Sequence, residues 1–205
     1  MSLSPSARVV LDWDGTVTEV DGLHMILEEF GDQSVYRQME GVLGEGLSLH
    51  EVIAAEIATI TLPLEDALEF VRRHVTVRPG FRELAERFRP AILSSGFVEL
   101  IEPVLEREGV IGLELYANRL DPRPDGWRPV WRDEAVCAEC GEACKRASIG
   151  DSPVVYVGDG YSDRCAALAA DRVFAIDGLA RYLDGRGIRF EPFTDLRDVA
   201  ASLAS

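Results

Sequence analysis

The chain has 205 residues, of which 47% are hydrophobic and 28% charged, a composition typical of a globular protein with one core and a small accessory domain. Its formal net charge of −15 argues against nucleic acid or an anionic membrane as a partner, because both require a basic surface. The first residues are polar and no apolar run is long enough to span a bilayer, so we expect a cytoplasmic protein.

The first predicted element is a buried strand at Arg8–Leu11, a short apolar run that turn residues follow. The strand leads into Asp12 and Asp14, and Gly15 then lets the chain turn sharply. Carboxylates at the carboxyl end of a strand lie where open α/β sheets bind ligands, and burying two together is costly unless a cation is present. The pattern predicts a magnesium site with one carboxylate free to react.

Residues 21–76 are predicted to be helical, because apolar residues recur there at helical spacing and no strand pattern intervenes. Ser48, followed three residues later by Glu51, is typical of a capping box at the start of a helix. We therefore expect a small helical cap inserted after the first strand. Its four helices are predicted over residues 22–30, 34–43, 49–60 and 64–74.

After residue 76 the predicted strands alternate with helices, which implies a mostly parallel sheet with right-handed crossovers. The expected fold class is α/β, with a Rossmann-like doubly wound sheet built from residues 1–20 and 77–205. Strands are predicted over residues 90–94, 113–120, 127–131, 154–157 and 173–176. Helices are predicted over residues 81–88, 98–108 and 162–170, and from about residue 196.

Three further polar groups lie beside the predicted core strands. Ser94–Gly96 ends one strand before a helix, where backbone N–H groups and the helix dipole bind phosphate. Lys145 can neutralise a phosphoryl oxygen together with an attacking carboxylate. Asp159 and Asp163 again place two acids after a strand. Singly, these residues could be a helix cap, a surface lysine and a turn, but together and in this order they favour a phosphate site.

Together with Asp12-x-Asp14-Gly15-Thr16, these groups resemble the four motifs of the haloacid dehalogenase-like superfamily of phosphatases. The resemblance implies that Asp12 is the nucleophile and forms an aspartyl-phosphate. It also implies that Asp14 is the general acid for the leaving alkoxide and then the general base for water.

The resemblance also implies the ligands of Mg²⁺ and of phosphate. Asp12, the backbone carbonyl of Asp14 and Asp159 would bind the metal, and Asp163 would orient that shell through hydrogen bonds. The phosphoryl oxygens would be held by Ser94, by the N–H groups of Ser95 and Gly96, and by Lys145.

The position of the cap and the run Ala117–Leu120 resemble the phosphoserine-phosphatase-like branch of this superfamily. Asp21 falls where that branch carries an acid that binds the amine of the substrate, and Ser162 falls where it often carries an asparagine. The predicted cap helix around Glu56, however, lacks the arginine that holds the carboxylate of phosphoserine. This difference argues against phosphoserine as the substrate.

Three stretches resemble the methionine-salvage type of phosphatase, which acts on 2-hydroxy-3-keto-5-methylthiopentenyl 1-phosphate. They are Gly41–Leu43 ahead of Leu47, Arg78–Glu83, and a group of cysteines that runs into Lys145. Ser95 and Trp13 depart from this type, which usually has glycine and phenylalanine there. We therefore expect Mg²⁺-dependent hydrolysis of a small phosphorylated metabolite, with the salvage compound as one candidate.

Two other classes of function stay open. A phosphotransferase would use the same aspartyl-phosphate but pass the phosphoryl group to an alcohol. A non-catalytic module would bind a phosphorylated ligand or be an interaction protein stabilised by zinc, although a binder needs no nucleophile such as Asp12. The sequence has no distinctive signal for an oligomer. The spacing of four cysteines fits either a zinc site or free thiols, and these are Cys137, Cys140, Cys144 and Cys165.

Overall fold

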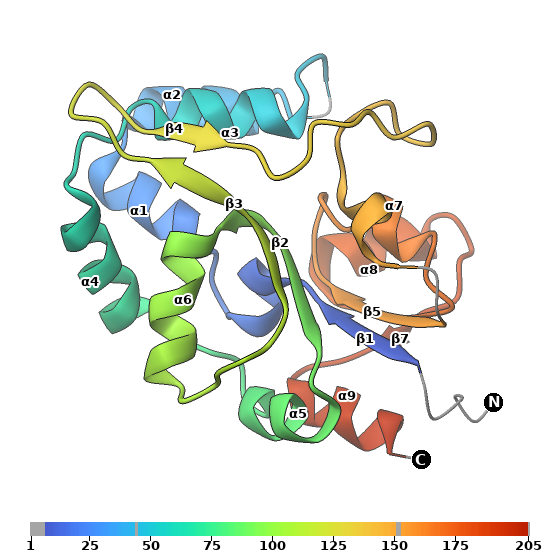
Figure 1. The fold of residues 1–205 in the computed structure, drawn as a ribbon. Coiled ribbons are helices and arrows are strands. Elements are labelled where there is room, and N and C mark those ends of the chain that lie inside the picture. The colour runs from blue at the N-terminus through green and yellow to red at the C-terminus, as the bar shows by residue number, and fades with distance from the viewer. Residues whose placement is uncertain (1–6, 44, 151–152, 205) are drawn as a thin grey trace.

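The structure, a computed structural model, describes residues 7–43, 45–150 and 153–204. Residues 1–6 of the expected core segment lie outside the described residues. Seven strands in the described part of the chain form one sheet (Figure 1). In spatial order they are β4 (Arg128–Val130), β3 (Leu115–Asp121), β2 (Ala91–Phe97), β1 (Arg8–Leu11), β5 (Val154–Gly158), β6 (Arg172–Ala175) and β7 (Glu191–Pro192).

The central strand β1 marks the point where the order of the strands reverses. The strands from β2 to β4 lie on one side of it and those from β5 to β7 on the other, and only β4 runs antiparallel. Such a switch point is where open α/β sheets bind ligands, outside the carboxyl ends of the strands. Leu11 pairs with Ile92 of β2 and with Val157 of β5. This register brings the residues that follow the three strands to the same edge.

Helices cover both faces of the sheet (Figure 1). Side chains alternate along β1, so that Leu11 joins an apolar cluster with Phe81 and Leu196, whereas Val10 joins a second cluster with Leu179. The predicted doubly wound α/β fold is therefore confirmed. The core helices are α5 (Phe81–Phe88), α6 (Val98–Arg107), α7 (Arg164–Ala167), α8 (Asp177–Asp184) and α9 (Leu196–Leu203).

Four helices come between β1 and β2 in the sequence: α1 (Gly22–Phe30), α2 (Gln33–Glu40), α3 (Leu49–Ile57) and α4 (Leu64–His74). The chain enters and leaves this segment side by side, because Thr18 and Val77 form an isolated antiparallel bridge. Apolar residues of α1 and α3 belong to the same buried cluster as α5 and α6. The division into a core (1–20 and 77–205) and a cap (21–76) stays a proposal.

The ends of the helices follow local signals. Ser48 and Glu51 form the predicted capping box, in which each side chain accepts from the backbone N–H of the other residue. The helix expected over residues 34–43 ends at Glu40, directly before Gly41, and the helix expected to reach residue 60 ends at Ile57.

Further elements differ from the prediction, among them the edge strand β7, which the sequence did not predict. The strand β2 continues to Phe97, so that Ser94–Gly96 belongs to the strand and not to the start of a helix. The helix expected over residues 162–170 is shorter, α7 at Arg164–Ala167, and the Asp163 carboxylate before it accepts the N–H groups of Asp159 and Gly160, the two residues that follow β5. The helix α8 was not predicted, because the Asp-Gly pair at its start is typical of a turn.

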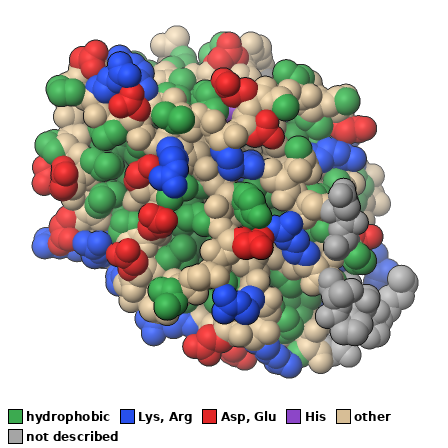
Figure 2. Space-filling view, in the orientation of Figure 1, with side chains coloured by type: hydrophobic (Ala, Val, Ile, Leu, Met, Phe, Trp, Pro, Cys, Tyr) green, Lys and Arg blue, Asp and Glu red, His purple; other side chains and the backbone are tan. Residues whose placement is uncertain are grey.

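The face of the molecule in Figure 2 carries acidic and basic side chains interspersed with hydrophobic ones. The excess of acidic residues is therefore not gathered into a single field on that face. Among the described residues, no helix has the length and the apolar character that crossing a membrane requires.

Candidate active site

The sequence motifs converge at the carboxyl ends of β1, β2 and β5. A cavity of about 260 Å³ opens there, between the sheet and helices α1 to α3. This volume suits a small metabolite better than a large ligand. Its polar lining includes Asp12, Asp14, Ser94, Ser95, Asp159 and Ser162 from the core, and Asp21, His24, Glu40 and Glu56 from the helices.

The turn after β1 depends on a glycine. Gly15 has φ +77°, and a Cβ atom at this position would collide with the carboxylate of Asp159. The Thr16 hydroxyl donates to Asp159 Oδ1 at 2.9 Å, and Arg78 donates to the carbonyl groups of Gly15 and Thr16. These contacts fix Asp159 against the turn that carries Asp12.

Lys145 is buried between two carboxylates. Its Nζ donates to Asp12 Oδ1 at 2.5 Å and to Asp163 Oδ1 at 2.7 Å. Burial alone would lower the pKa of Lys145, but the charges of Asp12 and Asp163 raise it above its ordinary value. The lysine is therefore a fixed positive charge beside Asp12. We call Asp12, Lys145, Asp159 and Asp163 the carboxylate–lysine group.

Asp163 uses both of its oxygens in hydrogen bonds. Oδ1 accepts from Lys145 and from the Tyr156 hydroxyl, both at 2.7 Å, and Oδ2 accepts the N–H groups of Asp159 and Gly160, both at 2.9 Å. Burial would raise the pKa of Asp163, but Lys145 and these hydrogen bonds hold it below its usual range. Asp163 therefore orients Lys145 and the turn after β5.

Carboxylate oxygens of Asp12, Asp159 and Asp163 all lie within 4.8 Å of one another. Burial and then Asp163 raise the pKa of Asp12 well above its ordinary value, although Lys145 opposes this. Burial raises the pKa of Asp159 to about 6. Carboxylates this close together favour a shared proton or a cation, and an all-oxygen donor set suits Mg²⁺. The residues therefore fit the expected metal, with Asp12 and Asp159 as its carboxylate ligands and Asp14 in the same turn.

Asp14 lies on the cavity side of that turn. Its Oδ1 accepts the Gly22 N–H at 2.9 Å, and Ser94 Oγ lies 3.4 Å from its Oδ2. Burial and then the charge of Asp21 raise the pKa of Asp14 to about 8. The raised pKa favours the protonated form of this side chain, which is the form that a general acid requires.

The predicted phosphate-binding segment is arranged differently from the expectation. The Gly96 N–H donates to Ser94 Oγ at 2.8 Å, so it is not free for a phosphate in this structure. The segment stays extended because Phe97 still pairs with Asn118 of β3, and the side-chain amide of Asn118 donates to the Ser95 carbonyl. A Cβ atom on Gly96 would come within 2.8 Å of Asp14 Oδ2, so the glycine makes room for the acid.

The opposite side of the cavity carries three acids and one histidine. Asp21 caps α1 by accepting the His24 N–H at 2.9 Å, and the His24 ring lies 3.8 Å from Asp21 and 3.7 Å from Glu40. Burial would lower the pKa of His24, but Asp21 and Glu40 raise it above its ordinary value. We call Asp21, His24, Glu40 and Glu56 the acidic roof.

Glu56 is the most deeply placed member of the acidic roof, with 2% of its surface exposed. Within the described part of the chain, its Oε1 has no hydrogen-bond partner. Burial and then Glu40 raise its pKa to about 7. The sequence predicted Asp21 as a substrate residue and Glu56 as unfavourable to a carboxylate, but it gave no signal for Glu40. For His24, one turn after Asp21, it left both a substrate-facing and a structural role open. The spacing Asp21-x-x-His24 was the sequence signal for the contact between these two side chains.

The fold and the site define the class of protein. The chain belongs to the haloacid dehalogenase-like hydrolase family, whose family model matches residues 9–168. This membership confirms the predicted superfamily. Together with the phosphatases to which the chain is similar, it also confirms the prediction of a phosphoric monoester hydrolase.

Particular relatives cover nearly the whole chain. It is 29% identical over 213 residues to the 2-hydroxy-3-keto-5-methylthiopentenyl-1-phosphate phosphatase of Exiguobacterium sibiricum, a match that covers 96% of this chain and 95% of the relative. It is also 29% identical to Pdp3-interacting factor 1 of Schizosaccharomyces pombe, a match that covers 99% of this chain and 97% of that protein. The fold resembles a solved structure of a phospho-aspartyl intermediate analogue of phosphoserine phosphatase, with a TM-score of 0.72 and 19% identity. This match covers 98% of this chain and 100% of the solved chain.

Proposed function

We propose that the protein is a Mg²⁺-dependent phosphatase that hydrolyses a small phosphorylated metabolite through an aspartyl-phosphate on Asp12. The observation that carries this proposal is the ion pair of 2.5 Å between buried Lys145 and Asp12, the latter of which lines the cavity of about 260 Å³. A buried lysine beside a carboxylate neutralises the repulsion that a phosphate dianion would meet on approach.

The first step forms a bond between Asp12 and the phosphorus atom and breaks the bond from phosphorus to the leaving oxygen. Asp14 gives its proton to that oxygen, so that an alcohol leaves. Asp14, now ionised, then takes a proton from water, and the water oxygen attacks the phosphorus. The bond to Asp12 breaks and inorganic phosphate leaves, which restores the carboxylate of Asp12 and the proton of Asp14.

The other residues position the reacting groups. Asp163 holds Lys145, and Thr16 holds Asp159. Ser94 and Ser95 lie at the wall of the cavity, where their polar groups can bind phosphoryl oxygens. Mg²⁺ on Asp12 and Asp159, once bound, would supply positive charge to the phosphoryl group.

The acidic roof narrows the class of substrate. A leaving group with a carboxylate would face Glu56 and Glu40. Among the described residues that line the cavity there is no arginine or lysine, so that His24 alone could offset the repulsion by several acids. The same side of the cavity carries the apolar side chains of Leu23, Val52 and Ile53. We propose a leaving group without a carboxylate, with an apolar part and hydroxyl or keto groups. The compound named for the relative from Exiguobacterium sibiricum has this chemistry.

The test compares the wild type with Asp12→Asn on three substrates: an aryl phosphate, 2-hydroxy-3-keto-5-methylthiopentenyl 1-phosphate and phosphoserine. We expect Mg²⁺-dependent release of phosphate from the first two, abolished by chelator and reduced about 10³-fold or more in the variant. Asp66→Asn, an exposed acid on α4, serves as the matched control and should keep full activity.

Two results would count against the proposal. Turnover that survives Asp12→Asn would remove the assignment of the nucleophile, and phosphoserine as the preferred substrate would remove the role of the acidic roof. Trapping the phosphorylated enzyme with hydroxylamine locates the intermediate. Transfer of phosphate to an added alcohol, in place of water, would favour a phosphotransferase.

A further inference from the structure

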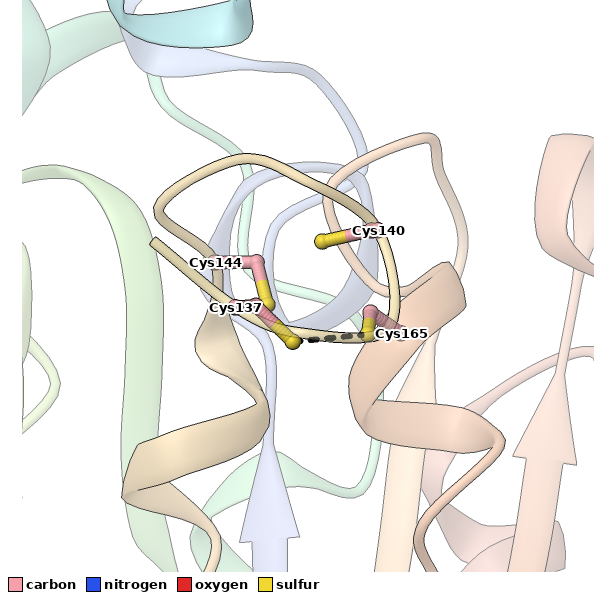
Figure 3. Close-up of side chains that lie close together, drawn as sticks. All are labelled: Cys137, Cys140, Cys144 and Cys165. Carbon is pink, nitrogen blue, oxygen red and sulfur yellow. Dashed lines mark hydrogen bonds between the residues drawn. The ribbon is translucent and has the colours of Figure 1, made fainter. Parts of the chain in front are cut away.

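A second cluster of potential metal ligands lies outside the candidate active site. All four cysteines of the chain come together, and one sulfur from each lies within 4.8 Å of the others (Figure 3). Three of them, Cys137, Cys140 and Cys144, belong to the loop that follows β4, and Cys165 lies in α7. None of the four forms a disulfide. The cluster therefore joins two segments that are separate in the sequence.

The distances fit a tetrahedral set of sulfur ligands. Zinc binds cysteine sulfur at about 2.3 Å, which places the sulfurs of a tetrahedral site roughly 3.8 Å apart. The Sγ atoms of Cys137 and Cys165 lie 3.7 Å apart, and the remaining pairs stay below 4.8 Å. A disulfide would require a separation of about 2.05 Å between two of them. The arrangement thus suits one shared ion better than a covalent pair.

The loop holds these sulfurs in place through its own backbone. The Gly141 N–H donates to the Cys137 carbonyl and the Cys137 N–H to the Glu142 carbonyl, both at 2.9 Å. Gly141 has φ +77°, a conformation that favours glycine. These contacts hold the segment from Cys137 to Glu142 in a closed turn.

Trp131 fixes the start of this loop by stacking on His50, and Arg132 and Glu142 add hydrogen bonds to other segments. No other residue of 131–144 belongs to an apolar cluster. Residues 131–144, all of which are described, contain no helix or strand. Val136 in this segment is 72% exposed, so it adds nothing to a core. Loops of this length without regular structure are uncommon in compact domains unless they have a function. A metal ion bound by the four sulfurs would supply the stability that apolar packing does not.

We propose that Cys137, Cys140, Cys144 and Cys165 bind one Zn²⁺ as a structural site, separate from the Mg²⁺ site and beyond the proposed function. Sulfur would occupy all four positions, which is typical of structural rather than catalytic zinc. As the four Zn–S bonds form, the thiols release their protons to solvent.

The position of the cluster gives the metal a role in the active site. Cys144 directly precedes Lys145, and Cys165 comes two residues after Asp163. Lys145 and Asp163 form the ion pair of 2.7 Å that supports Asp12. By joining the loop to α7, the metal would fix both ends of this pair. The four cysteines are thus positioning residues for the phosphatase reaction.

The first test measures zinc in the full-length protein, purified from zinc-supplemented cells and dialysed against a weak chelator. We expect close to one equivalent of zinc in the wild type and close to none in Cys140→Ser. Ala138→Ser, which places a hydroxyl on the same exposed loop, is the matched control and should keep the zinc. Cys140→His should also keep it, because histidine can replace one cysteine in such sites.

Spectroscopy and alkylation test the site without relying on a variant that could fail to fold. Co²⁺ exchanged into the wild type should show the visible bands of tetrahedral thiolate coordination. Zinc should protect Cys140, the exposed cysteine, from iodoacetamide. A wild type without stoichiometric zinc, or cysteines alkylated equally fast with and without it, would overturn the proposal.

Activity separates this proposal from the proposed function. Asp12→Asn should lose turnover and keep its zinc, whereas Cys140→Ser should lose zinc and have a lower kcat at saturating Mg²⁺. One equivalent of zinc in a wild type that has no phosphatase activity would overturn only the proposed phosphatase function. Full activity in a wild type without zinc would overturn only the metal site.

Discussion

Both sides of the cavity carry buried acids, but the acids of one side have hydrogen-bond and ion-pair partners that those of the other side lack in part. In the carboxylate–lysine group, Asp163 uses both oxygens in hydrogen bonds and Asp12 is paired with Lys145. In the acidic roof, Glu56 is equally buried and leaves one oxygen without a partner. The first group is fixed before any ligand arrives, as chemistry common to a family requires. In the acidic roof, Oε1 of Glu56 stays available for a hydrogen bond with a substrate, and contacts of this kind determine substrate specificity.

The variant with the largest expected effect is Lys145→Met, which removes the cation from the carboxylate–lysine group. Asp12 and Asp163 would then be buried without a counter-charge, and breaking such a pair costs about 3–5 kcal/mol. Urea unfolding should show this loss, and added Mg²⁺ should recover part of it. Arg123→Met, which breaks an exposed pair with Asp121, should change stability by no more than about 1 kcal/mol. A loss for Lys145→Met as small as that of Arg123→Met would contradict the fixed-charge role.

Asp14→Asn should reduce turnover of an alkyl phosphate by about 10²–10⁴-fold, because the leaving alkoxide needs a proton. The loss should be much smaller for an aryl phosphate with an acidic leaving group. Stability should change little, because the pKa of Asp14 is raised to about 8 and the neutral amide resembles its protonated form. Steady-state kinetics on the two substrates measure the difference. An equal loss for both would exclude Asp14 as the acid.

Glu56→Gln tests the unmet carboxylate of the acidic roof. The pKa of Glu56 is raised from 4.5 to about 7, so its favourable contribution to folding is complete below pH 4.5 and lost as the pH rises through 7. The glutamine variant lacks this loss and should gain stability over the wild type between pH 5 and pH 8, by about 1–2 kcal/mol. Glu65→Gln, an exposed acid of α4, is the control. Thermal unfolding at both pH values gives the answer, and a gap that does not widen with pH refutes the prediction.

The sequence predicted one side of the cavity better than the other, for a physical reason. Asp12 and Asp159 follow apolar strands, and the register of parallel strands brings such positions together without further information. The sequence around Lys145 does not indicate that this lysine is buried, because its partner Asp12 lies 133 residues away in the chain. Only its place in an ordered set of motifs predicted a role.

The acidic roof and the end of β2 were less predictable. Glu40 and Glu56 lie on different helices and meet only through helix packing, which a one-dimensional pattern does not specify. The small residues Ser94–Gly96 fit a strand end and a helix start equally well. The pairing of Phe97 with Asn118 on the neighbouring strand decides for the strand.

The smallest expected effect links the two sides of the cavity. Asp21→Asn removes a charge that raises the pKa of Asp14, while asparagine still caps α1. Because Asp14 must be protonated to act as the acid, turnover of an alkyl phosphate should fall as the pH rises through about 8 in the wild type. In the variant this fall should begin at lower pH, by less than about one unit. The matched control is Asp32→Asn, which caps α2 on the surface and should leave the profile unchanged. If Asp21→Asn does not change the pH–rate profile, the acidic roof interacts with the substrate but does not influence the pKa of Asp14.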